Sequence, residues 1–171
     1  KAGIDFKHER FEFPEHDFKT IAYKAREFKP DLIFVCGYSV HLHPLLRDLR
    51  SAGLTKTDGS VMAVMDFVDL LYDKTPKAEL QGIAFACPLF EVKGAVAGSE
   101  AWRARYQKRY GKIPTYVAAY AYDTAGILGK TYSQSKKVDT ASIRKTLPYD
   151  GITGKINVDK DGDIIATITI A

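Results

Sequence analysis

The chain has 171 residues, of which 46% are hydrophobic and 27% are charged, and its formal net charge is +4. This length suits one domain of ordinary size, and the composition is typical of a globular protein. No apolar run approaches the ~20 residues that a membrane-spanning helix needs. The basic residues are scattered along the chain, which argues against a nucleic-acid partner.

The first half of the chain alternates predicted strands with predicted helices. Residues 6–13 predict a partly buried strand, and Asp17 is placed to cap a helix that ends before Pro30. Three short apolar runs, at 32–36, 60–65 and 82–87, predict further strands. A helix is predicted between the strands at 32–36 and 60–65, and its inner stripe consists of Leu42, Leu45, Leu46 and Leu49. Residues 66–72 are predicted to form a loop or short helix. Strands and helices in this order predict parallel βαβ units.

The second half has a different pattern. Helices are expected at 99–110 and from 115 to about 133, followed by a short helix capped by Asp139. The tail predicts two strands around an Asp-Gly turn. Three successive helices without an intervening strand cannot complete an α/β layer by themselves, so they need a sheet from elsewhere.

The two cysteines, Cys36 and Cys87, each end a short apolar run. Both positions predict buried strand residues, where cysteine behaves as a small hydrophobic side chain. Two cysteines in 171 residues do not form a disulfide framework, so we expect two free thiols.

Motifs for catalysis or metal binding are weak. His41 and His43 are two residues apart on a helix start, which places their rings on different faces. The acidic run at 159–163 does not have the ligand spacing of a calcium loop and fits a hairpin turn instead. The chain also lacks a nucleophile elbow and a phosphate loop. We therefore predict no catalytic residue, cofactor or metal, although an α/β enzyme of flavodoxin-like topology stays an alternative.

Two segments resemble a known family. They are residues 110–128 (YGKIPTYVAAYAYDTAGIL) and residues 149–163 (YDGITGKINVDKDGD). Together they resemble the second half of the type I periplasmic solute-binding proteins, in the branched-chain amino acid (Leu/Ile/Val) group of ABC transporters. The resemblance implies an α/β fold with a parallel sheet of order 2-1-3-4-5 and helices on both faces. In that order, the strand ending at Met65 separates the strands ending at Cys36 and Cys87.

The resemblance also implies how the chain is divided. Residues 1–88 correspond to the bulk of the second ligand-binding lobe without its first strand. Residues 89–150 correspond to a helical segment that returns to the first lobe, and 151–171 to strands that return to the second. The lobes would close about crossovers near 88–91 and 150–154. The missing strand would lie between 6–13 and 32–36, so the partner expected there is an absent N-terminal half or a second copy of the chain.

A ligand site is predicted where strands end. Ligands of open α/β sheets bind outside the carboxyl ends of the strands, which indicates residues 37–39, 66–67 and 87–90. In the family, an aromatic residue on the first turn and an acid on the second hold the ligand's amino group. Tyr38 and Asp66 match these positions approximately, although the family's acid is often Glu. Tyr116 matches an aromatic beside the ligand's side chain, and Ser39 and Phe67 complete the predicted set.

Each of these residues also has a purely structural interpretation. Tyr38 and Tyr116 could simply pack against neighbours, and Asp66 and Ser39 could cap helices.

The resemblance implies a function in transport. The chain would bind a small amino acid or related carboxylate and deliver it to the membrane permease of an ABC importer. Its location would be periplasmic or extracellular, with a lipid anchor at an absent N-terminus left open. The alternative is the ligand-sensing domain of a receptor or transcriptional regulator with the same fold.

Overall fold

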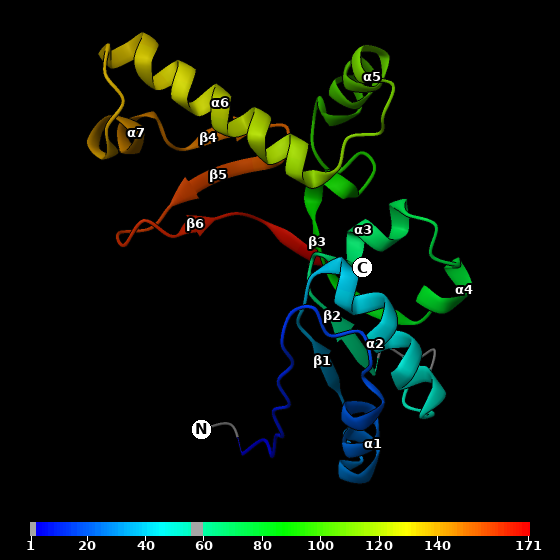
Figure 1. Cartoon of the computed structure of the whole chain (residues 1–171). Helices are drawn as coiled ribbons and strands as arrows, with labels where there is room; N and C mark the ends of the chain where they lie inside the picture. Colours follow the sequence, from blue (N-terminus) through cyan, green and yellow to red (C-terminus); the bar gives the residue numbers. More distant parts are fainter. Residues whose placement is uncertain (1–2, 56–59) are drawn as a thin grey trace. The chain divides into compact units, whose positions relative to one another are not determined.

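The computed structural model describes residues 3–55 and 60–171 (Figure 1). The chain forms two compact units. Unit 1 comprises Lys1–Ala86 with Ile170–Ala171, and unit 2 comprises Cys87–Thr169.

Unit 1 contains a parallel sheet and helices, as the sequence predicts. Its elements in chain order are α1 (Lys19–Phe28), β1 (Ile33–Val35), α2 (Ser39–Ser51), β2 (Val61–Ala63), α3 (Phe67–Tyr72), α4 (Lys77–Leu80) and β3 (Ile83–Pro88). The strand order is β1-β2-β3-β7, where β7 is Ile168–Ile170. Both β1–β2 and β2–β3 are parallel. The sequence predicts that the strand ending at Met65 lies between the strands ending at Cys36 and Cys87. The observed order, in which β2 lies between β1 and β3, confirms this prediction.

The core of unit 1 follows the predicted helix stripe. All four predicted leucines of α2 are buried, and they lie with Phe18, Val61 and Phe67, which are at most 1% exposed. The start of α1 is attached to α2 by Asp48, whose buried carboxylate accepts a hydrogen bond of 3.0 Å from the Phe18 amide. Asp17 precedes the helix by one residue more than predicted, yet its carboxylate still accepts a bond from the Lys19 amide.

The strand predicted at 6–13 is wrong. Residues 3–12 form neither helix nor strand. The alternating pattern is present, but no strand within the described residues 3–55 and 60–171 pairs with it, and Phe6 and Phe13 are 78% and 72% exposed. A period-2 pattern forms a strand only when a partner supplies ladder hydrogen bonds and a face to bury.

Unit 2 contains the remaining elements. These are η1 (Leu89–Glu91), α5 (Ser99–Tyr110), α6 (Tyr116–Ser135), α7 (Thr140–Thr146), β4 (Tyr149–Gly151), β5 (Gly154–Val158) and β6 (Ile164–Ile165), with the first part of β7. The three predicted helices are confirmed, and Asp139 caps α7 by accepting a 2.8 Å bond from the Ser142 amide. The predicted tail hairpin is β5–β6, which is antiparallel.

The hairpin turn explains the acidic run in the sequence. One carboxylate oxygen of Asp159 accepts bonds of 2.9 Å from the amides of Asp161, Gly162 and Asp163. Because β5 also pairs with β4, the strands up to β6 belong to unit 2. The chain returns to unit 1 at Ile170. The assignment of the two units to lobes of the family fold stays a prediction.

The two segments that carry the family resemblance meet at Asp123. This residue of α6 is 1% exposed. Its carboxylate accepts hydrogen bonds from the Ile152 amide at 2.9 Å, the Thr153 amide at 2.8 Å and the Thr153 hydroxyl at 2.6 Å. A buried carboxylate needs such donors because desolvation of an unpaired charge is costly. The Tyr-Asp pair of α6 and the turn after Tyr149 are thus one structural unit.

Two glycines allow this close contact. A Cβ on Gly151 would lie 2.3 Å from a carboxylate oxygen of Asp123, and one on Gly126 would lie 2.2 Å from the Tyr149 hydroxyl oxygen. Burial and the charge of Asp123 raise the pKa of Tyr149. Any larger residue at 126 or 151 would separate α6 from β4.

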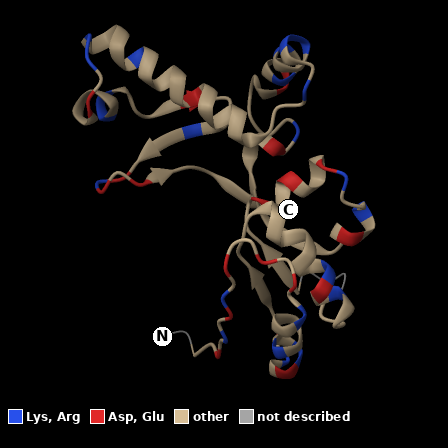
Figure 2. Cartoon of the chain, viewed as in Figure 1, with Lys and Arg blue, Asp and Glu red and all other residues tan. Residues whose placement is uncertain are grey.

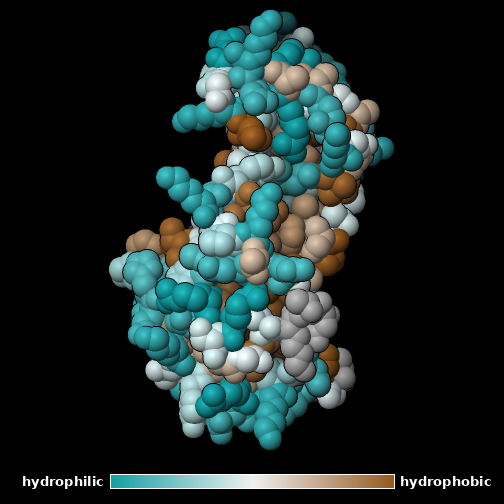
Figure 3. All heavy atoms as spheres, turned by 90° about the vertical axis from the view of Figure 1, so that its right-hand side faces the viewer, coloured by the Kyte–Doolittle hydropathy of each residue, from teal (hydrophilic) through white to brown (hydrophobic). Residues whose placement is uncertain are grey.

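Not all apolar side chains are buried. On the face shown in Figure 3, hydrophobic residues reach the surface in several groups among hydrophilic ones. The exposed large side chains include Leu32, Phe34, Tyr38, Ile113, Val117, Ile164 and Ile168. Acidic and basic residues are interspersed along the elements of both units (Figure 2). No helix within residues 3–55 or 60–171 combines the length and apolar character of a membrane span.

The Asp123 contacts lead to a stability prediction. The substitution Asp123→Ala leaves three donors of 152–153 without their acceptor, so the free energy of unfolding should fall by about 3 kcal/mol or more. Urea denaturation followed by circular dichroism measures this. Asp150→Ala, which removes an exposed carboxylate two residues away from the turn amides, is the control and should change stability by less than about 0.5 kcal/mol. Equal effects of the two substitutions would contradict the structural role of Asp123.

Candidate functional site

The predicted residues of unit 1 lie at the carboxyl edge of its sheet. Val35 of β1 is in register with Ala63 of β2. Tyr38 and Asp66 each follow this pair by three residues, so both lie in the segments that leave the same edge. This is the edge at which parallel α/β sheets bind ligands.

Tyr38 and Ser39 form the start of α2. Tyr38 is the N-cap residue, and its carbonyl accepts bonds from the amides of His41 and Leu42. Its side chain is not packed away, since the residue is 68% exposed. Ser39, the first residue of the helix, is half-buried. The exposed phenol of Tyr38 is therefore available to a ligand.

Asp66 and Phe67 form the start of α3. Asp66 is half-buried at the N-cap position, and its carboxylate makes no capping hydrogen bond. The structural interpretation of Asp66 as a helix cap is thus not what the structure shows. Phe67 is 1% exposed, and its ring lies 4.8 Å from that of Phe85. Only the backbone of Phe67 could meet a ligand, because its side chain belongs to the core.

Tyr116 belongs to unit 2, where it is the first residue of α6. It is 8% exposed, and its ring packs against Tyr120 at 6.0 Å. Its amide donates a bond of 2.6 Å to a carboxylate oxygen of Glu91. The sequence analysis did not single out Glu91, because an isolated acid after an apolar run carries no local signal for a buried contact.

His41 is a second residue that the sequence did not assign to the site. It is 3% exposed, and both of its ring nitrogens are buried without a hydrogen-bond partner among the described residues. Rings of Phe11, Phe13 and Tyr38 surround it, with centroids 5.3, 5.4 and 6.1 Å away. His43, by contrast, contacts Glu79 at 2.8 Å. The two histidines thus have different surroundings.

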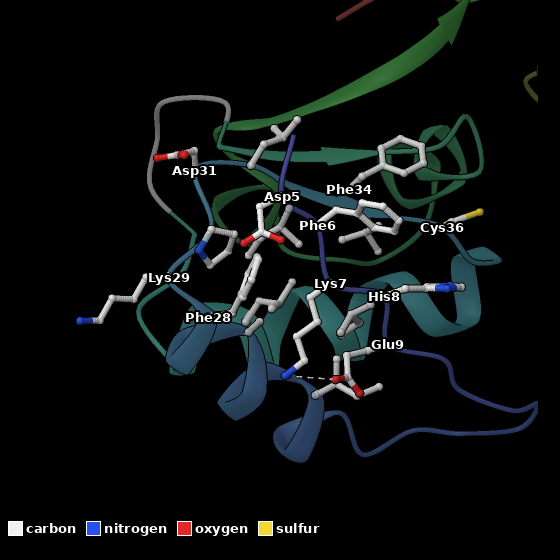
Figure 4. Close-up of a pocket in the computed structure, with 18 of the residues that line it drawn as sticks. Asp5, Phe6, Lys7, His8, Glu9, Phe28, Lys29, Asp31, Phe34 and Cys36 are labelled. Atoms are coloured by element: carbon white, nitrogen blue, oxygen red, sulfur yellow. Dashed lines mark ion pairs between the residues drawn. The ribbon is translucent and has the colours of Figure 1, made fainter. Parts of the chain in front are cut away.

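A large cavity of about 760 Å³ lies elsewhere in unit 1. It separates residues 4–11 from the free edge of β1, where the sequence analysis placed an additional strand. Figure 4 shows Phe6 of the N-terminal segment, Phe28 of α1 and Phe34 of β1 at this cavity, with the Lys7–Glu9 ion pair beside them. Leu45 and Leu49 of α2 also line it, but neither Tyr38 nor Asp66 does, so it is distinct from the site formed by these two residues.

The cysteines differ from each other. Both are free, as predicted. Cys87 is 4% exposed, whereas Cys36 is exposed. The predicted burial of Cys36 is wrong, because β1 ends at Val35 and Cys36 lies beyond the strand beside the cavity.

This difference predicts unequal thiol reactivity. The thiolate is the reactive form, and burial raises the pKa of the Cys87 thiol. Cys36 should react with a chromogenic disulfide reagent at neutral pH at least tenfold faster than Cys87. The variant Cys36→Ser should show only the slow reaction, and both thiols should react quickly in denaturant. Fast labelling of the Cys36→Ser variant under native conditions would contradict the burial of Cys87.

Comparisons with known proteins agree with this fold. Similar solved structures include the leucine-binding protein LivK of Thermotoga maritima, with 25% identity and a TM-score of 0.75 over 94% of this chain and 46% of that one. The LivJ substrate-binding protein of Streptococcus pneumoniae in complex with isoleucine has 21% identity and a TM-score of 0.71, covering 94% and 46%. A Rhodopseudomonas palustris solute-binding protein in complex with benzoate has 14% identity and a TM-score of 0.67, covering 94% and 44%.

The fold therefore defines the class as that of type I periplasmic binding proteins. The family described as periplasmic binding protein matches residues 1–171, and the chain belongs to this family. It spans about half the length of the similar solved structures. No curated protein sequence matches the chain.

Proposed function

We propose that the chain is part of the solute-binding component of an ABC importer, which binds a small amino acid or related carboxylate for a membrane permease. The proposal rests mainly on one observation. Tyr38, which is exposed, and Asp66, whose carboxylate makes no capping bond, follow two registered parallel strands at the same edge of the sheet. Family membership supports the class of function and a periplasmic or extracellular location.

The chemistry of the two side chains suits an ammonium group. The Asp66 carboxylate supplies charge and acceptors, and the exposed ring of Tyr38 can lie against a cation. The first-turn amides of α2, next to Ser39, suit a partial negative charge. No covalent step is needed, so we assign binding without catalysis to this site.

The ligand class can be identified by calorimetry. Full-length protein is titrated with L-leucine, L-isoleucine, L-valine, benzoate and 3,4-dihydroxybenzoate, because the similar structures are described with amino acids and with aromatic acids. Binding of the amino acids supports an ammonium site. Exclusive binding of the two aromatic acids, which have no ammonium group, would overturn the assignment of Asp66.

The substitution Asp66→Ala should weaken amino-acid binding by more than tenfold, because removing one partner of a buried charge pair typically costs ~2–5 kcal/mol. Asp31→Ala is the matched control, since Asp31 precedes β1 and lies at the opposite end of that strand. The control should leave the affinity unchanged. Unchanged affinity in Asp66→Ala would remove this residue from the site.

A further inference from the structure

Glu91 occupies an unusual position in unit 2. It is the last residue of η1, directly after β3, and its side chain is only 5% exposed. A carboxylate this deeply buried is costly unless each oxygen has a donor.

Both oxygens of Glu91 are bonded to different segments. One accepts the Tyr116 amide at 2.6 Å, and the other lies 3.3 Å from a guanidinium nitrogen of Arg103. Tyr116 begins α6 and Arg103 is in α5. Glu91 therefore connects η1 to two helices at once.

Arg103 completes the arrangement. Its guanidinium donates to the carbonyls of Phe90 and Pro114 and lies 3.7 Å from the centre of the Phe90 ring. Phe90 is fully buried and meets Trp102 edge-on, at 5.7 Å between centroids. The side chain of Arg103 is 17% exposed. The guanidinium thus bonds to the chain on both sides of α5, at Phe90 within η1 and at Pro114 just before α6.

The start of α6 depends on this contact. Its N-cap residue, Thr115, makes no side-chain capping bond. The first turn of a helix has amides without intrahelical partners and a partial positive charge, which a carboxylate stabilises. Glu91 supplies that carboxylate from a distance of 25 residues in sequence.

We infer that Glu91, held by Arg103, is a positioning residue that fixes the backbone of Tyr116 at the start of α6. Its effect on binding rests on the proposed function together with the sequence prediction that Tyr116 lies beside the side chain of a ligand. Glu91 itself does not need to touch the ligand. It sets the backbone of Tyr116 at the start of α6, and thereby the direction from which the ring approaches.

The substitution Glu91→Gln tests this role with little change in shape. Glutamine has one acceptor oxygen where glutamate has two, so Arg103 and the Tyr116 amide can no longer both be satisfied. Binding of L-isoleucine by the full-length protein should weaken about tenfold. Glu100→Gln is the matched control, because Glu100 is an exposed carboxylate on the same α5, and it should leave the affinity unchanged.

A double-mutant cycle separates positioning from general stability. If Glu91 acts through Tyr116, Glu91→Gln should have no further effect on L-isoleucine affinity in a Tyr116→Ala background. An equal loss in both backgrounds would overturn the inference. If Tyr116→Ala alone leaves the affinity unchanged, the ligand role that the sequence predicts for Tyr116 fails instead.

Hydrogen exchange of the Tyr116 amide provides a measurement that needs no ligand. The amide should exchange at least tenfold faster in Glu91→Gln than in the wild type, while the amides in the middle of α6 keep their protection. Unchanged exchange at Tyr116 would show that Glu91 does not hold this residue, whatever the binding data show.

Discussion

The arrangement of unit 2 depends on two buried carboxylates, one on α6 and one bonded to its first amide. Asp123 accepts three hydrogen bonds from residues 152–153, and Glu91 accepts the amide that begins the helix. Each carboxylate is stabilised only if its donors are in place, so Asp123 fixes the turn at 152–153 and Glu91 fixes the first residue of α6. Along its 20 residues, α6 carries only Asp123 and Lys130 as charged residues (Figure 2). The glycines at 126 and 151 then follow as a requirement of the close approach.

Unit 1 is organised by a different constraint, the register of its parallel strands. Pairing of Val35 with Ala63 brings the segments that begin α2 and α3 to one edge. The side chains at this edge differ in burial. Phe67 is buried in the core, whereas Tyr38 is exposed and Asp66 is half-buried. A scaffold of this kind supports many functions, so the proposed amino-acid site depends on these particular side chains and not on the fold alone.

The similarity to known proteins covers this whole chain but only part of each similar structure. The chain matches its family over its whole length, yet it spans about half of the similar solved structures. The activity of a complete binding protein, including its ligand and its permease, is accordingly a proposal for this chain. The cavity beside β1 and the exposed aromatic residues around it lie at the edge of the sheet where the sequence analysis expected another strand.

The sequence by itself determined the elements whose signals are local. Apolar periodicity indicated α2, α5 and α6 and the parallel strands β1 to β3, Asp139 marked the start of α7, and the Asp-Gly turn marked the tail hairpin. The tertiary structure decided what depends on partners distant in the chain. Residues 6–13 have a strand pattern but no strand to pair with, and Cys36 is exposed because β1 ends one residue earlier. Glu91 and Asp123 acquired their roles only when donors 25 to 30 residues away came within hydrogen-bond distance, because the need of a buried charge for donors is set by its three-dimensional surroundings and not by its neighbours in sequence.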